Sequence, residues 1–360
     1  MAKIQSNDRF GLNYKIMANQ HMLSSIFIVA LLFLAGGHAD ATSWRINNNA
    51  NRKAHFTDIN AAMSSSEVQA GDTLYLDPGC TLTTSQTVSK QVAIIGTGFF
   101  LPDGTHQVAT ISGVLYLSAA NAKIEGVTMT GEVHIRAQYV TIERCRATSS
   151  IKLSTNVNAQ YATIRQCYLT YNISGYGNTS AYSAYWTIEN NIILRTNYYH
   201  VIERLNNPII RNNYILYNYS NNSYYPIAEI QGGIITNNII FNKNTNNNVW
   251  GNVTDAVITH NVTSSAEKTD YPDNIYLADC DESLVFKMEG TNDQKYQLKD
   301  NSPAKGYATD GGDCGPYGGT HPYIPSGYPL GMPRFVSNSA GTRATDNKVC
   351  FSNQLSIQEK

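Results

Sequence analysis

Residues 187–193 read TIENNII, and nearly the same phrase returns as IIRNNYI at residues 209–215 and as IITNNII at residues 234–240. Each copy starts with β-branched residues and breaks at a pair of asparagines, which favours a short strand followed by a bend. Further copies are KIEGVTM from Lys123, TIERCRA from Thr141, TIRQCYL from Thr163 and VITHNVT from Val257. Their central isoleucines return every 18 to 25 residues, as Ile124, Ile142, Ile164, Ile188, Ile210, Ile235 and Ile258. This period, built from strand-type residues, predicts a solenoid.

One position inside the phrase identifies the kind of solenoid. Three residues after each isoleucine, from the second copy on, the chain places Cys145, Cys167, Asn191, Asn213, Asn238 and Asn261. If each turn stacks its strands in parallel on the turn before, these side chains form a column with a spacing of about 4.8 Å. Stacked amides can then bond to one another and to bend backbone that would otherwise be buried unpaired. We therefore interpret the six residues as a structural ladder without a catalytic role.

The repeats and the two ends of the chain resemble the right-handed parallel β-helix superfamily, which contains pectate lyases and polygalacturonases. The phrase from Phe56 is similar to the capping helix and first strand of that family, with Thr57 or Asp58 available as N-cap. The phrase from Asn301 resembles the tail of many exported bacterial β-helix proteins. The resemblance implies an all-β, single-stranded right-handed β-helix of about seven to nine coils. We place the N-terminal cap and first coils at residues 42–105, the β-helix at 106–300, and a Pro/Gly-rich C-terminal cap and tail at 301–360.

Residues 1–41 have the pattern of a secretory signal peptide. A weakly positive start precedes the apolar run Leu23–Ala35, and Ala39-Asp40-Ala41 fits a cleavage site. Thirteen apolar residues are too few to cross a bilayer, which takes about 20. No cysteine lies between the run and the cleavage site, which argues against a lipoprotein. We expect a secreted, periplasmic or cell-surface protein without a transmembrane segment after cleavage.

The charge excludes one class of partner. The chain has a net charge of −1 and only 15% charged residues, so it lacks the clustered cationic face that nucleic acids select. The six cysteines of the expected mature chain allow fifteen pairings. Cys145 and Cys167 are either stacked thiols, which we favour, or a disulfide, and Cys280 and Cys314 are another candidate pair.

Two enzymatic relatives suggest different chemistry. Polygalacturonase-type hydrolysis uses clustered aspartates and a Gly-His-Gly, but no aspartate occurs between Asp103 and Asp255 and the tripeptide is absent. A resemblance to lyases that act on chondroitin or alginate implies a Lys or Arg base and a Glu-plus-Asn site for Ca²⁺. No cofactor is required by the sequence, and Ca²⁺ is one option. The weak catalytic candidates are Lys152, His200, Glu203, Arg204 and Glu229, for which a solvated charge ladder is the alternative.

Aromatic residues suggest a binding surface. Tyrosine rings can stack on sugar C–H faces, and amides can bond sugar hydroxyls, although tyrosine also serves as an ordinary strand residue. The candidates for substrate binding are Tyr182, Tyr185, Tyr198, Tyr199, Tyr217, Tyr219, Tyr224, Tyr225 and Trp250. We expect a protein that binds or processes a polysaccharide or surface glycan outside the cytoplasm. A uronate-specific polysaccharide lyase and a non-catalytic structural or adhesive protein are the alternatives.

Overall fold

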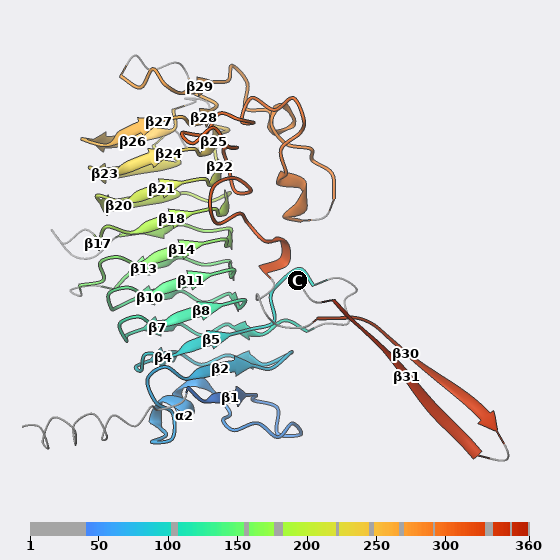
Figure 1. Ribbon diagram of the computed structural model, residues 1–360. Coiled ribbons are helices and arrows are strands. Elements are labelled where there is room, and N and C mark those ends of the chain that lie inside the picture. Colours follow the sequence, from blue (N-terminus) through green and yellow to red (C-terminus); the bar gives the residue numbers. More distant parts are fainter. Residues whose placement is uncertain are drawn as a thin grey trace, which may run out of the picture. The chain divides into compact units, whose positions relative to one another are not determined.

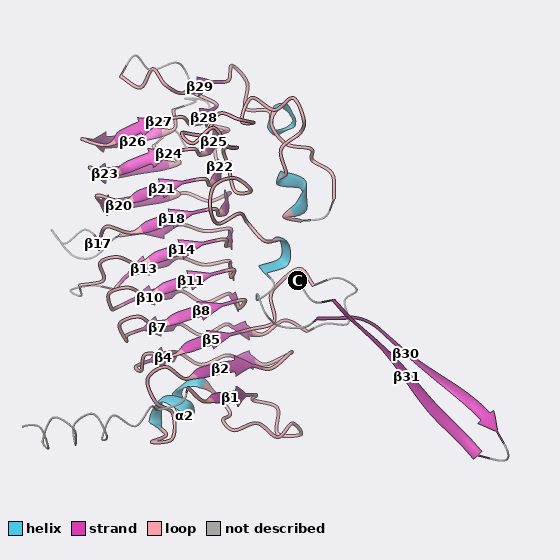
Figure 2. Ribbon diagram, in the orientation of Figure 1, coloured by secondary structure: helices cyan, strands magenta, loops and turns pink. Residues whose placement is uncertain are grey.

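The structure is a computed structural model that describes residues 41–101, 107–154, 158–175, 183–220, 223–244, 248–265, 270–290 and 292–327, and the backbone of 334–345 and 348–358. The chain divides into Met1–Ala41 and Thr42–Lys360, and the signal-peptide prediction lies almost wholly outside the described residues. Within the second unit, nearly all regular structure is β, in three parallel sheets of short strands stacked coil upon coil (Figures 1 and 2). The predicted parallel β-helix is confirmed.

The three sheets follow one another in every coil. Sheet A contains, in spatial order, β1 (Ser43–Ile46), β2 (Thr73–Leu76), β5 (Ala93–Ile95), β8 (Lys123–Glu125), β11 (Thr141–Glu143), β14 (Thr163–Arg165), β18 (Thr187–Glu189), β21 (Ile209–Arg211), β24 (Ile234–Thr236) and β27 (Val257–Thr259). Sheet B contains β3 (Thr81–Leu82), β6 (Thr110–Ile111), β9 (Thr128–Met129), β12 (Arg146–Ala147), β15 (Tyr168–Leu169), β19 (Ile192–Arg195), β22 (Tyr214–Tyr217), β25 (Ile239–Asn242), β28 (Val262–Thr263) and β29 (Ile275–Tyr276). Sheet C contains β4 (Gln86–Val88), β7 (Leu115–Leu117), β10 (Val133–Ile135), β13 (Ile151–Leu153), β16 (Ile173–Ser174), β20 (Ile202–Asn206), β23 (Ile227–Gln231) and β26 (Trp250–Thr254), and β17 (Ser183–Ala184) also pairs with β20. Among the described residues, eight coils have a strand in all three sheets, from β2, β3 and β4 to β24, β25 and β26, which agrees with the seven to nine coils that the resemblance implied.

The central isoleucines stack in register, as the repeat requires. Ile142 pairs with Ile124 and Ile164, and the same register continues through Ile188, Ile210, Ile235 and Ile258. All seven are buried in the interior. Each coil therefore contributes one isoleucine to a continuous apolar column along the axis, which is the main source of burial in a solenoid.

The asparagine ladder lies inside the coil, next to that column. The backbone N–H of Asn191 donates to Asn213 Oδ1 at 3.0 Å, and the N–H of Asn213 donates to Asn238 Oδ1 at 2.9 Å. The same bond joins Asn238 to Asn261, and Asn261 to Asn274, which the repeat did not reveal. Each side-chain amide oxygen thus accepts the backbone N–H at the bend of the preceding coil, and all five asparagines are buried.

Two cysteines continue the ladder as thiols. The N–H of Cys145 lies 3.5 Å from Cys167 Sγ, and the N–H of Cys167 donates to Asn191 Oδ1. Both sulfurs are unbonded, as are those of Cys80, Cys280 and Cys314. The favoured thiol interpretation is confirmed, and the disulfide considered between Cys280 and Cys314 is wrong; the Cys314 thiol instead donates to the His260 carbonyl at 3.3 Å.

A short helix covers the end of the coil next to β1 and β2 (Figure 1). Helix α2 (Ile59–Ser64) begins at Asp58, whose side chain accepts the N–H of Ala61 at 2.8 Å. Its buried face is Ile59, Ala62 and Met63. Asp58 is therefore the N-cap of the two candidates, and the helix covers apolar core that an open solenoid end would expose to water.

The irregular C-terminal segment packs against the side of the coil. It contains the 3₁₀ helices η1 (Glu282–Leu284), η2 (Gln294–Tyr296) and η3 (Pro325–Gly327), and its apolar residues cover the outer face of sheet B. The segment runs back toward the N-terminal coils, because Asn237 bonds to Thr309, Asn190 Nδ2 to Gly318 O at 2.6 Å, and Gln166 Nε2 to Pro322 O at 2.6 Å. Beyond it, β30 (Arg334–Thr345) and β31 (Lys348–Gln358) form an antiparallel hairpin.

Candidate functional site

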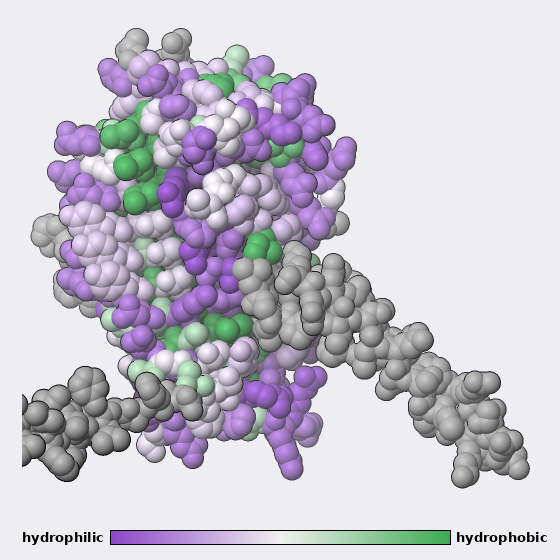
Figure 3. Space-filling view, viewed as in Figure 1, coloured by the Kyte–Doolittle hydropathy of each residue, from purple (hydrophilic) through white to green (hydrophobic). Residues whose placement is uncertain are grey.

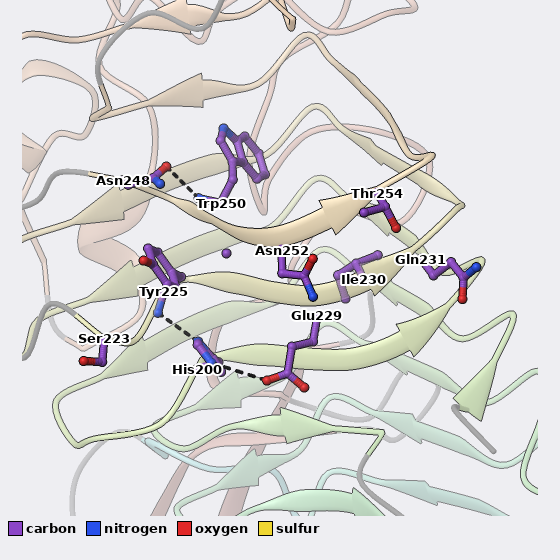
Figure 4. A pocket seen from close by; sticks show the side chains of 11 residues that line it. His200, Ser223, Tyr225, Glu229, Ile230, Gln231, Asn248, Trp250, Asn252 and Thr254 are labelled. Atoms are coloured by element: carbon purple, nitrogen blue, oxygen red, sulfur yellow. Dashed lines mark hydrogen bonds and ion pairs between the residues drawn. The ribbon is translucent and has the colours of Figure 1, made fainter. Parts of the chain in front are cut away.

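A cleft lies on sheet C over strands β23 and β26, with His200, which precedes β20, at its edge (Figure 4). Its volume is about 660 Å³, which falls in the range of small-molecule and cofactor sites. Aromatic, amide and hydroxyl side chains line it, together with one imidazole and one carboxylate. The lining residues are His200, Ser223, Tyr225, Glu229, Ile230, Gln231, Asn248, Trp250, Gly251, Asn252 and Thr254.

The cleft forms where one outward column loses its side chains. Glu203, Ala228 and Gly251 occupy equivalent positions in β20, β23 and β26. The Tyr225 ring lies against Gly251, where any Cβ would clash with it. The sequence change from Glu to Ala to Gly therefore makes room on the surface and fixes the place of one aromatic wall.

The next position of the same strands carries a polar column. Arg204, Glu229 and Asn252 all adopt left-handed backbone, with φ of 60°, 52° and 55°. Arg204 Nε donates to Glu229 Oε2 at 2.6 Å, and both side chains are about a third exposed. Glu203 and Glu229 are neighbours in adjacent coils but are not in register, because Glu203 pairs with Ala228 and Arg204 is the residue equivalent to Glu229.

His200 is held in one tautomer by the backbone. Its Nδ1 accepts the N–H of Tyr225 at 2.9 Å, so the neutral ring carries its proton on Nε2. Nε2 lies 3.8 Å from Glu229 Oε1, and the ring stacks on Tyr225 at 5.8 Å with a 10° interplanar angle. Burial lowers the pKa of His200, so the neutral imidazole is favoured.

Glu203 is the buried acid of the site. The residue is 5% exposed, and it accepts the Asn172 amide at 3.2 Å. Burial raises the pKa of its carboxyl above the ordinary value of 4.5, and the charge of Glu229 raises it further, although Arg204 acts in the opposite direction. A buried carboxyl that tends to keep its proton, beside an ionic pair, is typical of a functional site.

The structure does not bring Lys152 into this group. Lys152 pairs with Ser174 in the next coil, and Ser174 pairs with Glu203, so two strand steps separate the two charged residues. The Lys152 ammonium instead forms an ion pair with Glu132 at 2.8 Å. The other four candidates lie close together, but only His200 and Glu229 line the cleft; Glu203 lies beside them, and Arg204 is bound to Glu229.

His200, Glu203 and Glu229 are also the one group among the described residues whose ligand atoms lie close enough to hold a metal, within 4.8 Å of one another. The donor set does not fit Ca²⁺, which takes six to eight oxygens. His200 presents Nε2–H, a donor, toward Glu229, and Arg204 already occupies one oxygen of that carboxylate. The Ca²⁺ expectation stays a prediction, and no step below passes through a metal.

The predicted aromatic residues divide into four groups. Tyr225 and Trp250 both border the cleft, but Trp250 is buried and its ring packs in the core, so its inclusion as a binding residue is corrected. Tyr198, Tyr199 and Tyr224 form a neighbouring cluster with ring centroids 4.5 to 6.5 Å apart, in which Tyr198 and Tyr199 are exposed.

The third group is partly or wholly buried, or lies outside the described residues. The Tyr217 ring is wholly buried in the core, so its inclusion as a binding residue is corrected. Tyr219 packs against it, partly buried, with the ring centroids 6.5 Å apart. Tyr182 lies outside the described residues.

Tyr185 belongs to a feature that the sequence reasoning missed. Its ring stacks on Tyr161 at 5.1 Å, and Tyr161 stacks on Tyr139 at 5.0 Å, with interplanar angles of 10° and 5°. All three are exposed, and each precedes an anchor isoleucine by three residues, so the repeat already contained the signal. Because the faces are stacked on one another, this ladder presents mainly ring edges to a sugar.

The cleft amides were also missed individually. Gln231 ends β23, whereas Asn248 and Asn252 lie just before and within β26, and nothing distinguishes them in a chain rich in asparagine. A second exposed surface is aliphatic: Ile209, Ile234 and Val257 stack in sheet A, where Figure 3 shows hydrophobic side chains gathered over β21, β24 and β27.

Among the described residues, no helix is long and apolar enough to cross a membrane. No protein-family model matches the chain, and no curated protein matches its sequence significantly. The fold thus stands on the stacked repeats themselves: the chain forms a parallel β-helix whose sheet C carries a polar, aromatic-walled cleft.

Proposed function

We propose that this protein binds a carbohydrate chain in the sheet C cleft, outside the cytoplasm, and that it is a member of the pectate-lyase-like β-helix superfamily. The observation that carries the proposal is the lining of the cleft, in which the Tyr225 ring lies with the side-chain amides of Gln231, Asn248 and Asn252, while the Trp250 ring packs into the core beneath (Figure 4). Aromatic faces suit the C–H surface of a sugar, and amides both donate and accept for its hydroxyls.

The charges favour a neutral glycan. The cleft presents one carboxylate, Glu229, and a His200 ring whose neutral form is favoured. The nearest arginine, Arg204, is already paired with Glu229. A uronate chain would place its carboxylates against Glu229 without an opposing cation, which costs binding free energy.

The lyase remains the second candidate, because four of its five predicted residues lie together. Its weakness is the base: Lys152 and Arg204 are both engaged in ion pairs with glutamates, so neither side chain is free to abstract a proton. The structural or adhesive alternative predicts no glycan selectivity at the cleft.

The test is binding of the full mature chain to immobilised neutral polysaccharides (β-glucans, xylans, mannans, galactans) and to uronans (pectate, alginate, chondroitin). We expect binding to a neutral class, weakened about tenfold or more by Tyr225→Ala and by Gln231→Ala, since a central interface side chain contributes about 1–2 kcal/mol or more. Tyr139→Ala, in the exposed ladder away from the cleft, is the matched control. Absence of binding to every polysaccharide, or equal loss in the control, refutes the proposal.

A further inference from the structure

The turn between β19 and β20 presents two tyrosine rings to solvent. Tyr198 and Tyr199 are 51% and 43% exposed, and their ring centroids lie 4.5 Å apart at an angle of 44°. Tyr224, from the connection before β23, supports them from the core side, with its ring 6.5 Å from Tyr198 and 5.9 Å from Tyr199. We call Tyr198 and Tyr199 the tyrosine platform.

Ring contacts join the platform to the cleft. His200 follows Tyr199 in the sequence and lines the cleft. Its ring stacks on Tyr225, the aromatic wall of the cleft, and meets Tyr224 edge-on at 5.4 Å. Tyr224 in turn contacts both rings of the platform, so the cleft wall and the platform form one continuous aromatic surface.

The shape of the turn is maintained against two costs. Tyr199 has a φ of 94°, which glycine tolerates and a residue with a Cβ rarely adopts. Beneath it, the Arg195 side chain is wholly buried, donates from Nη2 to the Tyr198 carbonyl, and lies over the Tyr171 ring at 4.0 Å. Burying a charge is unfavourable unless its contacts offset the loss of water. A strained backbone and a buried arginine thus hold two rings in the solvent, and strain of this kind clusters at ligand-holding positions.

We propose that the tyrosine platform is a second sugar subsite, and that the protein therefore binds a stretch of several units of a long neutral glycan. The inference rests on the carbohydrate site proposed above. Exposed tyrosine faces suit the C–H surface of a further sugar unit. The occupant is the same chain, because the aromatic surface is continuous with the cleft. Once one unit is held in the cleft, contact of a linked unit with the platform is intramolecular, so affinity rises with chain length.

The test is isothermal titration calorimetry of the full mature chain with oligosaccharides cut from the polysaccharide that it binds, beginning with the shortest that binds measurably. Wild type should bind longer oligosaccharides about five- to tenfold more tightly than the shortest. Tyr199→Gly should lose most of this gain and keep the affinity for the shortest one. Because glycine relieves the strain at a φ of 94°, the urea midpoint of this variant should not fall, which separates lost binding from lost folding.

Tyr139→Gly is the matched control, since Tyr139 is also exposed with left-handed backbone, at a φ of 58°, and lies in the ladder away from the cleft. It should keep the full gain with length, whereas Tyr225→Ala should weaken binding at every length. Equal affinity at all lengths, or an unchanged gain in Tyr199→Gly, overturns the second subsite and leaves the cleft proposal intact. Self-association through the platform without a length effect overturns it as well. Absence of binding to any polysaccharide, or full binding in Tyr225→Ala, refutes the proposed function itself.

Discussion

Replacing Asn213 by alanine removes one rung of the buried ladder. Its Oδ1 accepts the backbone N–H of Asn191 at 3.0 Å, and its Nδ2 donates to the Ile188 carbonyl at 2.8 Å. Alanine leaves both groups buried and without these partners, at about 1–3 kcal/mol each. We therefore expect the free energy of unfolding to fall by about 2–5 kcal/mol.

The assay is equilibrium unfolding in urea, followed by far-UV circular dichroism, with Asn218→Ala as control. Asn218 is exposed, and its contact with Arg195 is made by its backbone N–H, so the control should shift stability by less than about 0.5 kcal/mol. A loss of less than about 1 kcal/mol in Asn213→Ala would refute the reasoning, because a buried rung would then carry no hydrogen-bond energy. Asn213→Cys should lie between the two, since Cys145 and Cys167 already occupy this column.

Three further predictions concern thiols, pH and the C-terminal segment. Burial raises the pKa of Cys145 to about 12 and also raises the pKa of Cys167. A thiol reagent should therefore label the half-buried Cys280 in the folded protein, and Cys145 and Cys167 only after unfolding. Labelling of Cys145 or Cys167 before Cys280 would contradict their burial. Because the folded-state pKa of Glu203 lies above 4.5, the native state binds the extra proton and stability should fall as pH rises through the window that begins near 4.5. Urea titrations from pH 4 to 8 should show that Glu203→Gln loses this part of the slope, and an unchanged slope would show that Glu203 titrates normally. Asn190→Ala removes the hydrogen bonds from the Asn190 amide to the Pro316 and Gly318 carbonyls. We therefore expect faster proteolysis near residues 313–322 in this variant than in the control Asn218→Ala. Identical cleavage rates would mean that these bonds do not hold the segment against the coil.

The repeat predicted the interior of the coil well, because its physical cause is local. A strand of β-branched residues followed by an amide at a fixed spacing allows stacking in register, so Ile124 through Ile258 and the ladder from Cys145 to Asn261 were all readable from sequence. The Tyr139–Tyr161–Tyr185 stack obeys the same period and could have been found the same way.

The surface was less predictable, because its contacts join residues whose positions do not follow the repeat. Asn190 bonds to carbonyls more than 120 positions later, and carbonyls carry no residue identity to recognise. Similarly, the cleft depends on Gly251 admitting the Tyr225 ring and on a left-handed residue at Glu229, neither of which is visible in composition or spacing. The sequence pointed to the candidate residues on β20 and β23, but not to their register, in which Arg204 and not Glu203 is equivalent to Glu229.

Hydrogen exchange with and without a bound oligosaccharide tests the carbohydrate cleft most directly. An oligosaccharide taken from the polysaccharide that the protein binds should slow amide exchange in residues 223–231 and 248–254, which line the cleft, and leave residues 139–141 and 161–163 of the tyrosine ladder unchanged. Slowed exchange at the tyrosine ladder alone, with the two cleft segments unaffected, would contradict the account.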